Sequence, residues 1–332
     1  MAWWRIFSFV LAMGSGAIAS VAAKPVPPVP VLVAKGVWTV SGGITPDRQP
    51  DGNSVIFDAP GGLIVFDTGR HVWHRNAILA LAREEGKPIA AIINSHWHLD
   101  HVSGNPALRA AFPHLRVYAS AAIDGALAGF LPDSVRQSEP YLNDPALPAA
   151  TRDDIRADMA TIANGPALRP DMTVIGSHSL RIAGRQLMVR LAANAATAGD
   201  VWLYDGKTRI VVTGDLVTLP APFLDTACPE GWQRALARIT ATPFRTLIPG
   251  HGPPMTPPQF ALYRHSFDAF IACVGSSEPK TVCAAAWTEQ VRPLLGDDPV
   301  DGKRAQGMAT YYVEMLRANR GRSKYCAAPA HH

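Results

Sequence analysis

Three histidines and an aspartate fall within six residues in the stretch NSHWHLDH, Asn94–His101. The stretch follows the apolar run PIAAIIN, which is typical of a buried strand. His96, His98 and His101 offer imidazole nitrogens and Asp100 offers a carboxylate, so an extended loop could bring all four to one or two metal ions. Packing has no use for such a cluster, because serine or asparagine would be solvated equally well at a strand end. The chain therefore has to fold around a metal-binding strand end.

Alternating strand and helix patterns surround this stretch. SVIFDAP and GLIVFDTG are β-branched and aromatic runs broken by glycines, which predicts two paired strands. MTVIGSHSLRIAGRQLMVRLA, DVWLYDGKTRIVVTGD with the hairpin turn YDGKT, and RTLIPGHG predict further strands. Helical spacing of apolar residues predicts helices over residues 73–85, 232–240, 259–274 and 304–320. Two strand-rich halves with helices on their outer sides predict an α/β fold of four layers, an αββα sandwich.

The chain divides into several predicted segments. Residues 1–23 combine one positive charge, an apolar run and small residues near a cleavage site, which indicates a secretory signal peptide. A proline-rich leader follows at 24–30, then the sandwich domain at 31–256 and a helical C-terminal extension at 257–332, packed on that domain. Within the domain, the alanine-rich and proline-interrupted residues 119–171 predict a helical insertion or lid. No later stretch has the roughly 18 unbroken apolar residues of a membrane span, so we expect no stable membrane insertion after signal cleavage.

Composition and charge narrow the class of partner. Hydrophobic residues make up 48% of the 332 residues and charged residues 17%, as in a globular protein with a large core. The formal net charge is +4, from 31 basic and 27 acidic residues. This excess is too small and too scattered to indicate a nucleic-acid partner.

Four cysteines lie after the signal, and none has the spacing of a zinc ribbon. An even number in an exported chain predicts two disulfides, for which three pairings exist. The short separation of Cys273 and Cys283 favours their pairing, which leaves Cys228 with Cys326. The signal and the cysteines together predict a secreted, periplasmic protein.

The histidine cluster and three short motifs resemble the metallo-β-lactamase superfamily. The pattern H-x-H-x-D-H follows a hydrophobic strand, and FDTG at 66–69, TGD at 213–215 and PGHG at 249–252 occur in the order of that family. The resemblance runs from about Val31 to Met255. It implies the αββα fold and a zinc-dependent hydrolase in which metal-bound hydroxide attacks an ester, lactone, thioester or lactam-type bond.

The resemblance also implies roles for single residues. One metal site would be formed by His96 and His98, and a second by Asp100, His101 and His251, with Asp215 between them. Asp100 would be the catalytic carboxylate that holds the attacking hydroxide and carries its proton. Asp67 of FDTG is interpreted as a hydrogen-bonding residue of the scaffold rather than as a ligand. One or two zinc ions per chain are therefore expected.

One ligand of the family pattern is missing. The family supplies a histidine in a stretch resembling H-T-x-G-D, whereas this chain reads AATAGD and has Ala196 at that position. Either the site works with a weaker first ion, or another side chain reaches in. The candidates are Asn194, which on a strand would point the same way as Ala196, and His71 and His74, which follow FDTG. The alternative is a zinc-binding protein with little or no catalytic activity.

The segment LVTLPAPFLDTACPEGW follows Asp215 directly. Its prolines and aromatic residues make it rigid and apolar. Two interpretations fit this composition, a wall of a substrate pocket and plain core packing.

Overall fold

The computed structural model describes residues 27–296 and 299–326. The predicted signal peptide and the start of the leader lie outside the described residues, and residues 27–30 have no regular secondary structure. Among the described helices, none combines the length and the apolar composition that crossing a membrane requires.

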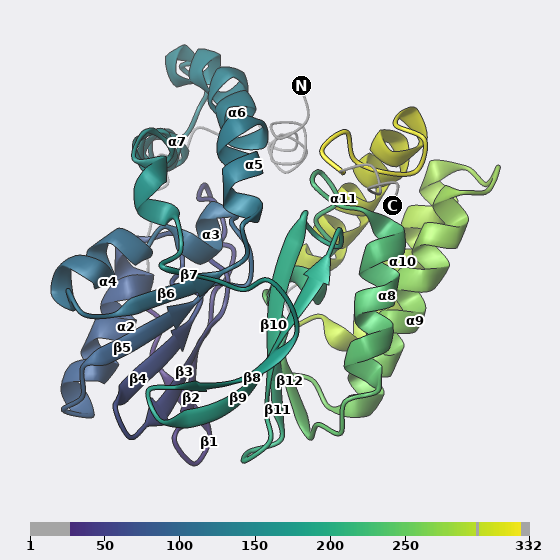
Figure 1. Cartoon of the computed structure of the whole chain (residues 1–332). Coiled ribbons are helices and arrows are strands. Elements are labelled where there is room, and N and C mark those ends of the chain that lie inside the picture. Colours follow the sequence, from purple (N-terminus) through teal and green to yellow (C-terminus); the bar gives the residue numbers. More distant parts are fainter. Residues whose placement is uncertain (1–26, 297–298, 327–332) are drawn as a thin grey trace.

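Two sheets lie face to face at the centre of the molecule (Figure 1). The first has seven strands in the order of the sequence: β1 (Val31–Ala34), β2 (Val37–Val40), β3 (Ser54–Ala59), β4 (Gly62–Phe66), β5 (Ile89–Ile93), β6 (Arg116–Ala119) and β7 (Met172–Thr173). The second has the order β12-β11-β10-β9-β8, with β8 (His178–Ile182), β9 (Arg185–Ala193), β10 (Gly199–Asp205), β11 (Ile210–Val212) and β12 (Thr246–Ile248). Phe57, Ile64 and Ile93 of the first sheet form one buried cluster with Val189 and Leu203 of the second. The apolar runs seen in the sequence are therefore strands covered on both faces.

Helices cover both outer faces and complete the predicted αββα sandwich. Ile78 and Leu81 of α2 (Val72–Glu84), with Leu108 of α4 (Asn105–Ala111), pack on the outer face of the first sheet. The helices α8 (Pro229–Thr240), α9 (Pro257–Val274), α10 (Lys280–Val291) and α11 (Pro299–Ala318) contribute to the cluster on the other side. Prolines in the first turns of α8 and α9 extend these two helices a few residues before their predicted starts, because proline is favoured there.

Residues 119–171 contain the predicted helical insertion. It forms α5 (Ala122–Ala128), α6 (Phe130–Ser138), η1 (Glu139–Asn143), α7 (Ala149–Ala163) and η2 (Gly165–Leu168). Phe130 and Leu131 of α6 pack against Trp97 and Leu99, which belong to the histidine-rich stretch. The insertion thus stands above the end of the first sheet at which the cluster lies (Figure 1).

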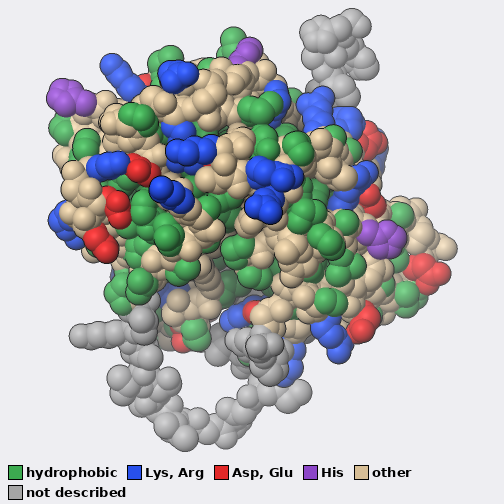
Figure 2. Space-filling view, turned by 90° about the horizontal axis from the view of Figure 1, so that it is seen from below, with side chains coloured by type: hydrophobic (Ala, Val, Ile, Leu, Met, Phe, Trp, Pro, Cys, Tyr) green, Lys and Arg blue, Asp and Glu red, His purple; other side chains and the backbone are tan. Residues whose placement is uncertain are grey.

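Figure 2 shows the opposite end of the sandwich, where Lys and Arg side chains are spread among hydrophobic ones. The few histidines visible on this face are separated from one another, so no histidine cluster is visible there.

Both predicted disulfides are confirmed. Cys228 is joined to Cys326 across 98 residues, and Cys273 to Cys283 across 10 residues.

We expect replacement of either pair by serine to lower the free energy of unfolding by about 2 to 4 kcal/mol, with the larger loss for Cys228–Cys326, because a cross-link over a longer loop restricts the unfolded chain more. Urea denaturation of the two double variants measures both losses. A larger loss for the Cys273–Cys283 pair would contradict the expectation.

Candidate metal centre

The histidine-rich stretch begins where β5 ends. Sequence reasoning expected an extended loop, but the chain turns at Ser95–Trp97 and enters a short helix, α3 (Leu99–Val102). His98 is the residue before this helix, and its carbonyl accepts a hydrogen bond from the amide of His101 at 3.0 Å. The expectation of an extended loop was wrong, because a tight turn followed by a helix buries the four candidate ligand side chains together, whereas a straight segment would spread them along one line.

The other candidate residues follow strands at the same end of the sandwich. Asp67 comes directly after β4, which is parallel to β5. Asp215 lies in η3 (Gly214–Leu216) after β11, and His251 lies after β12, which is parallel to β11. Because parallel strands end at the same edge of a sheet, two pairs of strand ends deliver all of these side chains to one place.

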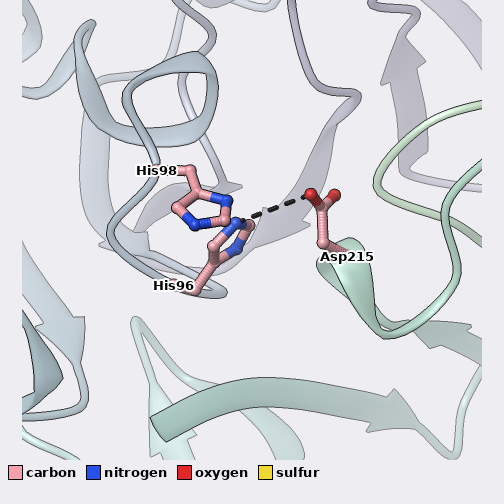
Figure 3. Close-up of side chains that lie close together, drawn as sticks. All are labelled: His96, His98 and Asp215. Carbon is pink, nitrogen blue, oxygen red and sulfur yellow. Dashed lines mark ion pairs between the residues drawn. The ribbon is translucent and has the colours of Figure 1, made fainter. Parts of the chain in front are cut away.

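Six predicted side chains form two groups with converging ligand atoms. His96, His98 and Asp215 are one group, and Asp100, His101 and His251 are the other. Within each group the candidate nitrogen and oxygen atoms lie within 4.8 Å of one another. Figure 3 shows His96 and His98 facing the Asp215 carboxylate, whose Oδ2 is 3.6 Å from His96 Nε2.

Asp215 lies between the two groups. Its second oxygen, Oδ1, is 3.2 Å from His101 Nε2 and 3.5 Å from His251 Nε2. Those two ring nitrogens are 3.3 Å apart, and His251 Nε2 is 3.1 Å from Asp100 Oδ2. The geometry therefore gives Asp215 one oxygen toward each group.

The buried carboxylates of this cluster favour a cation beside them. Burial alone would lower the pKa of His101, but the carboxylates of Asp215, Asp100 and Asp67 raise it well above its ordinary value. Burial also lowers the pKa of His96 to about 4, so that ring is neutral and offers a lone pair. His96 Nε2 and Asp215 Oδ1 are buried and make no hydrogen bond to any residue that the structure describes, although His101 is close to the latter. Buried polar atoms without partners are rare, and a divalent cation would satisfy both.

Asp67 orients the cluster from behind, as the sequence predicted. It accepts hydrogen bonds from the Ser95 amide at 2.7 Å, the Ser95 hydroxyl at 2.6 Å and His101 Nδ1 at 2.8 Å. Since His101 donates through Nδ1, the nitrogen left for a metal ion is Nε2, which faces the second group and would exchange its proton for the metal. Asp67 adopts a left-handed φ of 58°, and this turn directs its carboxylate back under α3.

Glycines allow the motifs to approach one another. A Cβ atom at Gly250 of PGHG would lie 2.1 Å from Asp215 Oδ1, and one at Gly52 would lie 2.3 Å from His101 Cε1. Both distances are far below contact, so these positions need glycine for the site to close.

The structure places His71, His74 and Asn194, the three candidates for replacing a histidine ligand at position 196, in other contacts or in another conformation than expected. His71 is bonded to Asp51 at 2.7 Å through Nδ1 and paired with Asp154 at 3.2 Å through Nε2. His74 contacts the Ser54 hydroxyl at 2.8 Å, and burial lowers its pKa to about 4. Proximity to FDTG was a misleading signal, because it says nothing of where each ring points.

Asn194 was proposed on the assumption that it lies on a strand with Ala196. That assumption is wrong, because β9 ends at Ala193 and Asn194 has a left-handed φ of 51°. Ala196 itself is buried in the loop between β9 and β10, and its carbonyl oxygen accepts a hydrogen bond from the Thr226 hydroxyl at 2.8 Å.

An apolar pocket opens beside the two groups. Most of its lining comes from α6, α7 and the segment after Asp215, with Phe130, Leu131, Val135, Ile155, Met159, Ile162, Leu219, Pro220, Ala221 and Phe223. His98, Asp100, Asp215 and His251 line its inner end. The rigid segment LVTLPAPF is thus one wall of the pocket, which is one of the two interpretations of its composition.

Sequence reasoning missed an ion pair inside this pocket. Arg70 is buried and donates to both carboxylate oxygens of Asp158 on α7, and its guanidinium is 3.8 Å from Asp100 Oδ1. The separation of 88 residues left no local signal for this contact. Arg48 binds Asp154 on the same helix at 2.5 Å. These pairs, with the His71 contact, hold α7 over the pocket.

Comparison with known proteins gives a consistent result. The sequence model of the metallo-beta-lactamase superfamily matches residues 48–258. A linear primary-alkylsulfatase of Pseudomonas sp. (strain ATCC 19151) is 26% identical over 225 residues, which cover 60% of this chain and 41% of the relative. A hydroxyacylglutathione hydrolase of Thermosynechococcus vestitus is 46% identical over 48 residues, 14% of this chain and 19% of the relative. The chain therefore spans less than half the length of these curated relatives.

Solved structures share the fold at low sequence identity. The metallo-beta-lactamase FIM-1 of Pseudomonas aeruginosa matches with a TM-score of 0.53 and 19% identity, covering 74% of this chain and 97% of that one. The sec-alkylsulfatase Pisa1 of Pseudomonas sp. matches with a TM-score of 0.60 and 17% identity, covering 92% of this chain and 52% of that one. The second similarity extends well beyond the residues that the superfamily model matches.

Proposed function

Because the chain belongs to the metallo-β-lactamase superfamily, we propose that it is an exported zinc-dependent hydrolase of a small molecule. The observation that carries the proposal is the convergence of four histidines and two aspartates from three strand ends into two adjoining groups. The buried atoms without hydrogen-bond partners support it further. The two groups offer imidazole nitrogens and carboxylate oxygens, which are the ligands that zinc takes in catalytic sites.

Each group would hold one zinc ion. His96 and His98 with Asp215 Oδ2 would hold the first, and Asp100, His101 and His251 with Asp215 Oδ1 the second. Bound there, zinc would supply a water that ionises near neutral pH and would polarise the bond under attack.

Asp100 is the proposed catalytic carboxylate. It lines the inner end of the pocket and lies 3.1 Å from His251 Nε2, so one oxygen faces the second group. Burial alone would raise its pKa, but His101 and His251 hold that pKa well below the usual range. Asp100 is therefore ionised and would accept a hydrogen bond from the attacking water and orient it, while carrying the proton of that water is the role that the family resemblance implies.

The pocket indicates a substrate with an apolar part. Its lining is mostly aliphatic and aromatic, and His98, Asp100, Asp215 and His251 bring the two groups to one end of it. A bond of the ester, lactone, thioester or lactam type would lie at this end, with the apolar part between α6, α7 and the segment 219–223. The alkylsulfatase relative adds alkyl sulfate esters to this range.

Export is proposed from residues 1–23 as a signal peptide, 24–30 as a leader, and the periplasm as the destination. The two disulfides fit an oxidising compartment.

A second candidate function is supported by one observation. Ala196, at the position where the family has a histidine, contributes no ligand atom to the first group. A weakened first ion would leave a zinc-binding protein of the same fold with little or no catalytic activity.

One experiment separates the two functions. Zinc per chain is measured by elemental analysis, and hydrolysis is measured with lactams, lactones, thioesters, phosphoesters and alkyl sulfates. The hydrolase predicts bound zinc and turnover that falls sharply in His101→Ala. Bound zinc without turnover on the whole panel would favour the second function, and turnover that is unchanged in His101→Ala would refute the metal assignment.

A further inference from the structure

Thr226 lies behind the first group in a position that no motif marks. Its side chain is buried, and its hydroxyl oxygen contacts two groups at once. One is the carbonyl oxygen of Ala196 at 2.8 Å, and the other is Nε2 of His98 at 3.1 Å.

The direction of these two hydrogen bonds follows from their chemistry. A carbonyl oxygen can only accept, so the Thr226 hydroxyl must spend its one hydrogen on Ala196. The hydroxyl can then only accept from His98, which therefore carries its proton on Nε2. In this tautomer the lone pair of the neutral ring lies on Nδ1.

The other two histidines of the stretch are also oriented by hydrogen bonds from one ring nitrogen to an oxygen of the scaffold. Ser95 donates its hydroxyl hydrogen to Asp67 at 2.6 Å, so it can only accept from His96 Nδ1 at 2.8 Å. His101 donates from Nδ1 to Asp67 at 2.8 Å. Each imidazole thus has one nitrogen fixed by an oxygen of the scaffold, which leaves the other free for a metal ion.

On the basis of the proposed function, we propose that Thr226 is a positioning residue that holds His98 in its zinc-binding tautomer and orientation. The hydroxyl ties the ring to the backbone of Ala196, where the family has a histidine ligand. In this chain the loop at Ala196 would support the first ion through a hydrogen-bond relay and not through a coordinating side chain.

The segment around Thr226 is rigid enough for this role. The Cys228 amide donates to the Ala195 carbonyl at 2.8 Å, and the Ser323 amide donates to the Ala227 carbonyl at 3.1 Å. The hydroxyls of Tyr311 and Tyr312 reach the carboxylate of Asp225, 2.9 and 3.1 Å away. The Cys228–Cys326 disulfide also links this segment covalently to Cys326.

The test is zinc binding by the purified protein, with free zinc set by a competing chelator and ions per chain counted by elemental analysis. Thr226→Val keeps the shape and removes both hydrogen bonds. We expect the weaker of the two binding steps to shift to about 10-fold to 100-fold higher free zinc, the usual effect of losing an outer partner of a metal ligand, while the tighter step stays. Thr226→Ser keeps a hydroxyl and should bind like the parent.

Two controls exclude a general loss of structure. Thr288→Val removes a threonine hydroxyl that donates to a helix carbonyl at 2.9 Å, and it should leave both binding steps unchanged. Melting temperatures with excess chelator should agree between the parent and the Thr226 variants, and Thr226→Ala gives the same comparison where valine unfolds the chain.

Every other outcome counts against the inference. Parent-like binding by Thr226→Val and Thr226→Ala, or equal weakening by Thr226→Ser, would overturn it. So would a parent that takes up a single ion held by the second group, which would leave the proposed hydrolase standing. A parent that binds no zinc at all would refute the proposed function itself.

Discussion

Replacing Asp215 with asparagine is expected to lower kcat/KM by roughly 10³-fold or more on whichever substrate the panel identifies. Among the described residues, Asp215 is the side chain placed between the two proposed ion sites, with Oδ2 toward His96 and Oδ1 toward His101 and His251. An asparagine has one oxygen in place of two, so one group must lose an anionic ligand. A bound metal contributes several kcal/mol to the transition state, and each 1.4 kcal/mol corresponds to about a factor of ten in rate.

Zinc content is the second readout of this variant. We expect fewer ions per chain at limiting zinc, because loss of a direct ligand should cost at least the roughly 10-fold to 100-fold known for outer partners. Asp154→Asn is the matched control for zinc content, since Asp154 is equally buried but pairs with Arg48 and His71. Full zinc content and full activity in Asp215→Asn would remove the bridging role.

The position of the candidate metal centre could be predicted because its signals are local. The cluster at His96–His101 comes directly after a buried strand, and TGD and PGHG come directly after two others. The parallel pairing of these strands then brings the motifs together, because parallel strands end at the same edge of a sheet. The αββα layers could be predicted for the same reason, from runs of apolar residues with the strand or the helix period.

The contacts that orient the cluster could not be predicted, since their partners are far apart in sequence. Thr226 and His98 are separated by 128 residues, and Arg70 and Asp158 by 88. The segment containing Thr226 was noticed for its prolines and aromatic residues, which gave no signal for its hydroxyl. The same limit explains the misplacement of His71 and His74, whose partners come from the preceding loop and strand.

A second large effect concerns stability and lies away from the metal centre. Arg185 of β9 is buried between the sheets, where it binds Asp205 Oδ2 at 2.6 Å and the Asp58 carbonyl of β3 at 2.6 Å. Its guanidinium also lies over the Phe57 ring, 5.0 Å from the centroid. One side chain therefore links the two sheets. Arg185→Ala should lower the free energy of unfolding by about 3 to 5 kcal/mol, because it leaves the buried Asp205 carboxylate without its cation.

Urea denaturation of a double variant tests the cause of this loss. In Arg185→Met with Asp205→Leu no charge remains to be buried, so most of the lost stability should return. Arg181→Ala is the control, because Arg181 is exposed on neighbouring β8 and should tolerate truncation. A double variant as unstable as Arg185→Ala would mean that the hydrogen bond to Asp58 and the contact with Phe57 carry the effect. In that case the link between the sheets would depend on the arginine itself and not on the pairing of two buried charges.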